Sequence, residues 1–129
     1  MTQFGLAASE RQVFEAQILS DNGDYYKAAS TAYEAMLQAA KALIQVQYID
    51  VKDDPDYIVQ EFRQRFYDTQ LFFDPFAGPK FALYLFHAHE EGLAGLDPAA
   101  VRRRIEEARL FIEAAYACYN RLGQQQALI

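Results

Sequence analysis

Five alanines recur at alternating spacings of four and three residues: Ala28, Ala32, Ala35, Ala39 and Ala42. An α-helix has 3.6 residues per turn, so it brings all five onto one face. Alanine is small and favours helix, which lets the backbone of a second helix approach closely. The adjacent stripe is also apolar and contains Ala29, Tyr33, Met36, Ala40 and Leu43. The pattern predicts the central helix of a bundle, from an N-cap at Asp24 to about residue 47.

A helix from about residue 6 to residue 20 is predicted to precede it. Apolar spacing places Val13, Phe14 and Ile18 toward the core. The sequence Asp-Asn-Gly at positions 21–23 predicts a tight turn after this helix. Because the turn is short, the first two helices should pack antiparallel.

Two shorter helices are predicted in the middle of the chain. Asp54 followed by Pro55 is typical of a helix start, and this helix should reach about Thr69. Its inward residues are predicted to be Ile58, Phe62 and Phe66. The next helix should run from near Pro79 to about Glu91, with Gly92 and Gly95 closing it; its buried side would contain Phe81, Leu85 and either Tyr84 or Ala88.

The last helix has the clearest boundaries, with Asp97 as N-cap, Pro98 at the first position and a predicted end at Gly123. Its apolar stripe is Val101, Ile105, Ala108, Ile112, Ala115, Tyr119 and Leu122. We therefore expect an all-α, up-and-down bundle of four to five helices. Residues 1–123 would form a single domain and residues 124–129 a frayed tail.

Charge and cysteine content restrict the classes of partner. The formal net charge is -6, so the overall surface repels the phosphate backbone of a nucleic acid. Cys118 is the only cysteine, which excludes an internal disulfide and favours a reducing, cytoplasmic location. No segment is apolar enough to predict a membrane span or an export signal.

The two histidines, His87 and His89, are the first candidates for chemistry. Residues two apart on a helix point about 200° from each other, so this pair is poorly placed to share a metal ion. His87 could hydrogen-bond Glu91 four residues on, and His89 is expected to be a capping or packed residue. No phosphate-binding glycine loop or nucleophile motif is present. We predict no catalytic residues, no metal site and no cofactor.

A binding surface is predicted from exposed aromatic and basic residues. The segment 70–79 combines turn residues with four large apolar side chains, and it should either plug the end of the core or contact a partner. The arginines at positions 102–104 should form a solvated face, with contact to an anion or an acidic partner as the alternative. The candidate binding residues are Phe72, Phe73, Phe76, Lys80, His87, Arg103 and Arg104.

The run from Asp21 to Ile44, DNGDYYKAASTAYEAMLQAAKALI, resembles the first helical hairpin of HEPN domains (higher eukaryotes and prokaryotes nucleotide-binding). In that family a Gly-Asp-Tyr turn precedes an alanine-rich helix ending in Ala-Lys-Ala-Leu. The spacing of Ala108, Phe111 and Ala115 is similar to the family's last helix. The resemblance implies a four- or five-helix bundle that is commonly a homodimer.

Many HEPN domains are RNases in which an arginine and a following histidine are separated by four to six residues. This chain has no arginine at that distance before His87 or His89. The resemblance therefore implies a non-catalytic interaction module that binds a partner protein or domain, such as an accessory domain of a nitrite or sulfite reductase. The alternatives are a nucleotide- or RNA-binding module that partners a nucleotidyltransferase, and a divergent RNase.

Overall fold

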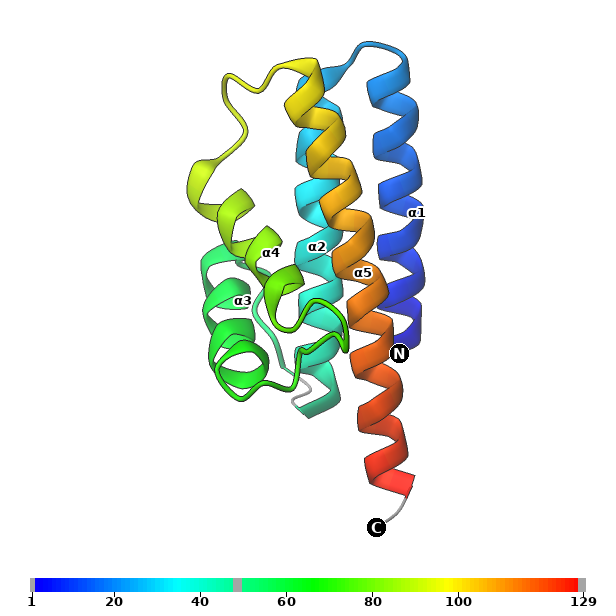
Figure 1. Cartoon of the computed structure of the whole chain (residues 1–129), viewed down its shortest axis with the longest axis vertical. Helices are drawn as coiled ribbons and strands as arrows, with labels where there is room; N and C mark the ends of the chain where they lie inside the picture. Colours follow the sequence, from blue (N-terminus) through cyan, green and yellow to red (C-terminus); the bar gives the residue numbers. More distant parts are fainter. Residues whose placement is uncertain (1, 48–49, 128–129) are drawn as a thin grey trace.

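The computed structural model describes residues 2–47 and 50–127, and within these ranges it is an all-α bundle. Three long helices lie side by side along the length of the molecule (Figure 1): α1 (Thr2–Asp21), α2 (Tyr25–Gln47) and α5 (Pro98–Ala127). The predicted fold class is confirmed. Within the described ranges, no helix combines the length and apolar character that a membrane crossing requires.

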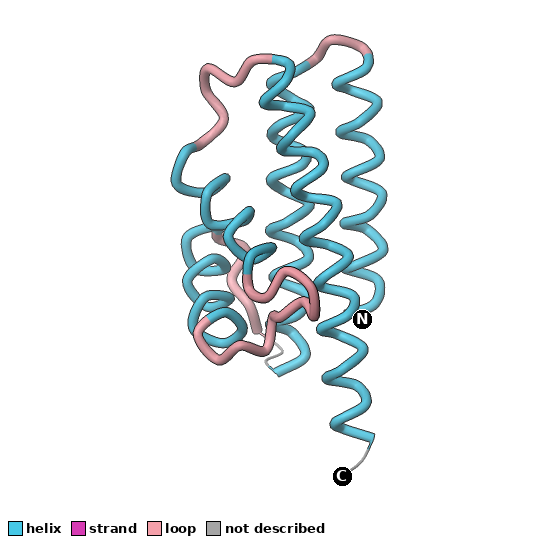
Figure 2. The backbone as a smooth tube through the Cα atoms, viewed as in Figure 1, coloured by secondary structure: helices cyan, strands magenta, loops and turns pink. Residues whose placement is uncertain are grey.

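A second group of shorter elements packs against α2 and α5: α3 (Pro55–Phe62), the π-helical turn η1 (Arg63–Tyr67) and α4 (Lys80–Glu91). In Figure 2 the loops lie at helix ends, and a long loop from Asp68 to Pro79 joins η1 to α4. The Asp54 carboxylate accepts from the Tyr57 amide at 3.3 Å, which confirms the predicted N-cap. The helix predicted over 55–69 is α-helical to Phe62 and π-helical from Arg63 to Tyr67, where it ends.

The α1–α2 hairpin is built as predicted. Gly23 has φ of +84°, a conformation that glycine adopts without strain, and the Asp24 amide donates to the Leu19 carbonyl at 2.9 Å. All five alanines of the central stripe are buried in α2. At the other end of the hairpin Gly5 faces this stripe, because a Cβ on Gly5 would lie 2.9 Å from the Ala42 Cβ.

The predicted inward face of α1 is wrong at two of three positions. Val13 is buried, but Phe14 is 69% exposed and Ile18 is 45% exposed. The buried stripe of α1 consists mostly of small residues: Leu6, Ser9, Val13, Ala16 and Ser20. Ser9 is tolerated there because its hydroxyl donates to the Gly5 carbonyl at 2.9 Å. Small residues suit a helix that packs against the alanines of α2, so the large side chains lie outside.

Aromatic rings fill the end of the core between α3, α4 and α5. The ring of Phe62 lies 5.0 Å from Phe72 and 5.5 Å from Phe111, measured between centroids. Phe72 therefore plugs the core, which is one of the two roles predicted for the loop. Its prediction as a binding residue is wrong, because its ring is buried and cannot reach a partner. In α4, Leu85 and Ala88 are buried as predicted, whereas Phe81 is only half-buried; the other buried residues of α4 are Ala82 and Phe86.

The last helix extends beyond its predicted end. Asp97 caps its first turn by accepting from the Ala100 amide at 2.7 Å, as predicted. The predicted end at Gly123 is wrong, because α5 continues through that glycine to Ala127. A single glycine lowers helix stability by about 1 kcal/mol but does not by itself end a helix. Residues 128–129 lie outside the described residues.

Candidate functional site

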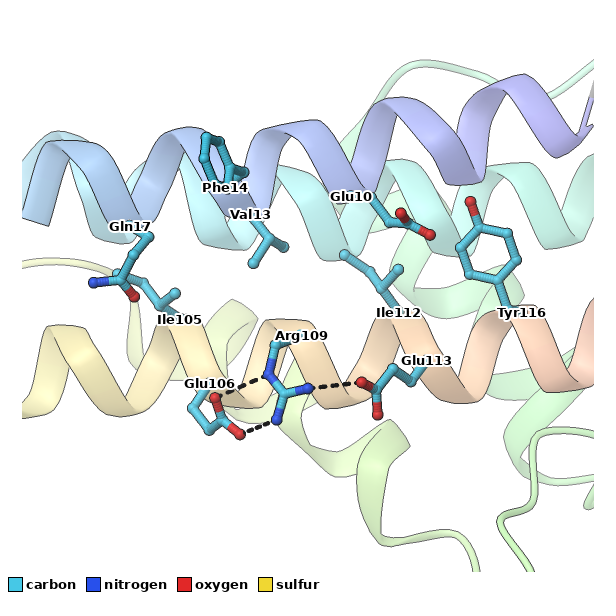
Figure 3. Close-up of a pocket in the computed structure, with 10 residues that line it drawn as sticks. All are labelled: Glu10, Val13, Phe14, Gln17, Ile105, Glu106, Arg109, Ile112, Glu113 and Tyr116. Atoms are coloured by element: carbon cyan, nitrogen blue, oxygen red, sulfur yellow. Dashed lines mark hydrogen bonds and ion pairs between the residues drawn. The ribbon is translucent and has the colours of Figure 1, made fainter.

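A groove of about 450 Å3 runs between α1 and α5 on the outside of the bundle (Figure 3). Its apolar surface comes from Val13, Phe14, Ile105, Ile112 and Tyr116, and its polar surface from Glu10, Gln17, Glu106, Arg109 and Glu113. In Figure 3 Val13 and Ile112 point into the space between the two helices. The groove thus has an apolar floor and a charged rim, which is typical of surfaces that bind apolar side chains of another protein.

Helical spacing explains why apolar residues form the floor of the groove and charged residues form its rim. On α5, Ile105 and Ile112 are seven residues apart, so they lie on one face above one another. Arg109 lies between them in sequence but is rotated toward solvent, where it is about half exposed. Because α1 and α5 pack directly against each other, their inward stripes also form the floor of the groove.

Arg109 is held on the rim by two carboxylates. Its Nη1 atom lies 2.7 Å from Glu113 and its Nε atom 3.0 Å from Glu106. A third bond joins its Nη2 atom to Glu106. The bond from Arg109 holds the pKa of the Glu106 carboxyl below its usual value. One guanidinium faces two carboxylates, so this part of the rim has a net negative charge.

Glu10 and Tyr116 face each other across the groove (Figure 3). Burial of the Tyr116 phenol, together with its hydrogen bond to Glu10, raises the pKa of Tyr116 to about 12. The phenol therefore stays protonated. The Glu10 carboxylate adds a further negative charge to the rim at this end of the groove.

Phe14 is the most unusual residue of the groove, because a large aromatic ring on a regular helix is 69% exposed. Ile18 follows four residues later, at 45% exposure, so the two lie on the same outer face of α1. The sequence contained this signal, since Ser9, Ala16 and Ser20 form an alternative inward stripe. Apolar spacing favours Phe14 and Ile18 as core residues, because it gives large side chains more weight than small ones.

A second hollow of about 480 Å3 lies between α2 and α3 and has a different character. Its wall includes Glu34, Gln38, Lys41 and Asp53, and Lys41 forms an ion pair with Asp53 at 3.5 Å. Because charged and amide groups line much of it, it offers less apolar surface to a protein partner than the α1/α5 groove.

The structure separates the predicted binding residues into two groups. Phe72, Phe73, Phe76 and Lys80 lie in or directly after the loop that precedes α4, and within this group Phe72 is buried and Phe76 is 98% exposed. His87, Arg103 and Arg104 lie toward the far end of α4 and the start of α5. His87 lies seven residues after Lys80, about 10 Å along the axis of α4, so the two groups are separated along this helix.

Arg104 was predicted as a surface residue, and the structure contradicts this. It is only 7% exposed, and its Nη2 atom donates to Glu91 at 2.8 Å. Burial of the Glu107 carboxyl raises its pKa, despite the nearby charges of Arg104, Arg103 and His87. The basic residues at this end of α5 thus face two carboxylates. A phosphate group would meet those negative charges as well as the arginines.

His89 is partly buried and packed, as predicted. Its Nδ1 atom lies 2.7 Å from the Tyr33 hydroxyl, and its Nε2 atom lies 2.8 Å from Asp56. Glu91, the candidate hydrogen-bond partner of His87, is bonded to Arg104. His87 is exposed on the outer side of α4, so the two histidines point in different directions.

Neither the Cys118 thiol nor the Tyr33 phenol is activated as a nucleophile. Burial raises the pKa of the Cys118 thiol to about 11, and burial followed by the charge of Asp56 raises the pKa of Tyr33. Nucleophilic catalysis usually needs a lowered pKa or an adjacent base. In the described part of the chain, no group of three or more His, Cys, Asp or Glu side chains is arranged to hold a metal ion.

A comparison with protein-family models finds no match for this chain, and a search of curated proteins finds none either. The resemblance to HEPN domains therefore rests on the residues quoted above.

Proposed function

We propose that this domain is a non-catalytic protein-interaction module that forms a homodimer through the α1/α5 groove. The supporting observation is the exposed ring of Phe14 beside an apolar floor that includes Val13 and Ile112. Burial of one phenylalanine side chain contributes about 1.5–3 kcal/mol. A partner that covers Phe14 and Ile18 would recover the apolar burial that the isolated chain lacks.

The groove supports protein binding better than catalysis. Its ionisable groups are paired with one another, as in the contact of Arg109 with Glu113 at 2.7 Å. Such a rim fixes the orientation of a partner and adds specificity, while the apolar floor supplies most of the affinity. Within this proposal the domain acts in the cytoplasm, and it is also suited to serve as an accessory domain of a larger enzyme.

Sedimentation equilibrium tests the proposal at protein concentrations up to about 1 mM, where even weak association is visible. We expect the wild type to show a monomer–dimer equilibrium. The substitution Phe14→Glu should shift it to the monomer, because a carboxylate would be desolvated at the interface. The matched control is Tyr26→Glu, since Tyr26 is 68% exposed but lies outside the groove.

A wild type that stays monomeric over the whole range would contradict the proposed homodimer. A dimer that is equally weakened by Phe14→Glu and Tyr26→Glu would show that general surface charge, and not the groove, controls association.

A further inference from the structure

One face of α1 is uncovered in the described part of the chain. In Figure 1 this helix forms an edge of the bundle, and its main contacts are with α2 and α5. The outer stripe, which turns away from both neighbours, recurs at alternating spacings of four and three: Ala7, Arg11, Phe14, Ile18 and Asp21. This is the spacing of a helix that packs along another helix. Its centre is apolar, since Phe14 is 69% exposed and Ile18 is 45% exposed.

The outer stripe is complementary to a second copy of itself. A symmetric pair uses the same face of both copies, so the stripe needs no other surface of the molecule to complete the contact. A two-fold axis at the level of Val13 and Phe14 brings the two Phe14 rings together at the centre of an antiparallel pair. Each ring is then covered from water by the other, which is the main driving force for association.

The charges of Arg11 and Glu15 select the antiparallel orientation. The two residues are four positions apart and lie on the same flank of the outer stripe, one on each side of the axis. In an antiparallel pair Arg11 of each copy therefore lies beside Glu15 of the other. Within the described residues neither side chain has an ion-pair partner, so both are available for this contact. A parallel pair would set Arg11 against Arg11 and Glu15 against Glu15, which like charges disfavour.

The opposite flank of the stripe borders the α1/α5 groove. Glu10 and Gln17 both line the groove, and Glu10 lies as far before the axis as Gln17 lies after it. Glu10 of each copy is thus opposite Gln17 of the other. The Gln17 amide donates one N–H to Asp21 at 2.9 Å and has a second N–H for the facing carboxylate. The carboxylates of α5 stay across the groove, where Arg109 engages them.

We propose that two copies associate by antiparallel packing of α1 on α1, with Phe14 at the centre and Arg11 of each copy beside Glu15 of the other. This inference rests on the proposed function and names the segment of the second copy that covers the groove from its α1 side. One helix face per copy is a small interface, since stable complexes bury about 1,200–2,000 Å2 in total. We therefore expect a weak dimer that forms at high protein concentration.

Charge reversal tests the pairing by sedimentation equilibrium. Arg11→Glu and Glu15→Arg should each raise the dimer dissociation constant by roughly tenfold, because each replaces two ion pairs by two repulsive contacts. The double variant restores opposite charges across the interface and should return to within about threefold of the wild type. Glu15→Arg also makes the chain less acidic, so general charge repulsion predicts tighter association for it. Tighter association of Glu15→Arg, or a double variant weaker than both single variants, would overturn the pairing.

Disulfide trapping tests the antiparallel register. One copy carries Glu10→Cys and the other carries Gln17→Cys, and mild oxidation should join them in a mixed disulfide. Gln17→Cys alone should not crosslink to itself, because antiparallel packing puts its two copies about 10 Å apart along the helix axes. In a parallel pair the same variant would crosslink to itself. Cys118 can stay in place, because it is buried and its thiol remains protonated.

The outcomes separate this inference from the proposed function. If Phe14→Glu abolishes the dimer, but the 10–17 disulfide does not form and the double variant does not recover, then the groove binds another surface of the second copy and the pairing of α1 with α1 is wrong. If the wild type stays monomeric up to about 1 mM, both proposals fail. A self-crosslink of Gln17→Cys would show a parallel pair and would also overturn this inference.

Discussion

The Tyr33 hydroxyl lies 2.7 Å from Nδ1 of His89, and this contact joins α2 to the end of α4. On the other side of the imidazole, Nε2 lies 2.8 Å from Asp56 at the start of α3. A neutral imidazole can accept at Nδ1 and donate from Nε2, which satisfies both partners. Three helices thus meet at one histidine, although its neighbourhood has no activated nucleophile.

We predict that Tyr33→Phe lowers the free energy of unfolding by about 1 kcal/mol, because it leaves Nδ1 of His89 without a donor. Chemical denaturation at pH 7 measures this change. Tyr26→Phe is the matched control, since Tyr26 is mostly exposed, and its effect should stay within about 0.5 kcal/mol. Equal losses in both variants would mean that the bond does not contribute to stability.

Because Gly5 and Ala42 lie so close together, the effect of Gly5→Ala on the free energy of unfolding should change sign when Ala42 is replaced by glycine. Alone, Gly5→Ala should destabilise the fold by about 1–3 kcal/mol, because its Cβ would lie 2.9 Å from the Ala42 Cβ. In an Ala42→Gly background the same substitution should instead stabilise, by up to about 1 kcal/mol, since alanine favours helix. Thermal unfolding of the four proteins of this cycle checks both signs. A stabilising effect in both backgrounds would show that α1 and α2 are not in close contact here.

Neighbouring residues Glu106 and Glu107 should respond oppositely to pH. Burial raises the pKa of Glu107 in the folded state, so its contribution to stability is present below the unfolded pKa and is lost as pH rises through the folded pKa. Glu107→Gln should therefore stabilise the protein at pH 7, with a gain that shrinks toward pH 4. The free energy of unfolding across this range measures the effect. A loss of stability at pH 7 would contradict the assigned burial.

For Glu106 the hydrogen bond from Arg109 lowers the pKa in the folded state. Its contribution to stability is present above the unfolded pKa and is lost as pH falls through the folded pKa. Glu106→Gln should lower the free energy of unfolding by about 0.2–1 kcal/mol at pH 7, the usual range for an exposed ion pair. It should have no effect at a pH below the folded pKa of Glu106. The same titration of unfolding free energy checks this sign.

Cys118 should be unreactive in the folded protein. With a pKa of about 11, roughly one thiol in a thousand is ionised at pH 8. A thiol-specific chromogenic disulfide should label it only after unfolding in urea. The unfolded thiol loses its proton first as pH rises from about 9 to about 11, so stability should also decline over this interval. Fast labelling of the native protein would contradict the burial of this side chain.

The bundle was predictable from the sequence because its signals are local. The alanine stripe of α2 and the caps Asp54 and Asp97 depend on spacing and on single-residue chemistry, and all of them are confirmed. The predicted inward face of α1 is wrong at Phe14 and Ile18, because the pattern of large apolar residues favours them over the smaller residues that are buried. Which residues of α1 face inward depends on how closely α1 can approach α2. This distance is set only when the two helices pack together.

The candidate site was predicted only in part. Of the predicted binding residues, Phe76 is exposed, but Phe72 is buried in the core and Arg104 is buried against Glu91. The groove could not be predicted, because its residues come from opposite ends of the chain. Glu10 and Tyr116 are 106 positions apart in sequence and meet only when α1 and α5 pack together.

The central claim is that the α1/α5 groove is the surface through which two copies associate. An amide NMR spectrum recorded over a dilution series from about 1 mM to about 10 μM tests it most directly, because it reports every backbone position separately. We predict concentration-dependent shifts at residues 10–18 and at residues 105–116, while amides around Lys41 and Asp53 stay constant. Shifts confined to the Lys41–Asp53 face, or a spectrum unchanged by dilution, would contradict the account.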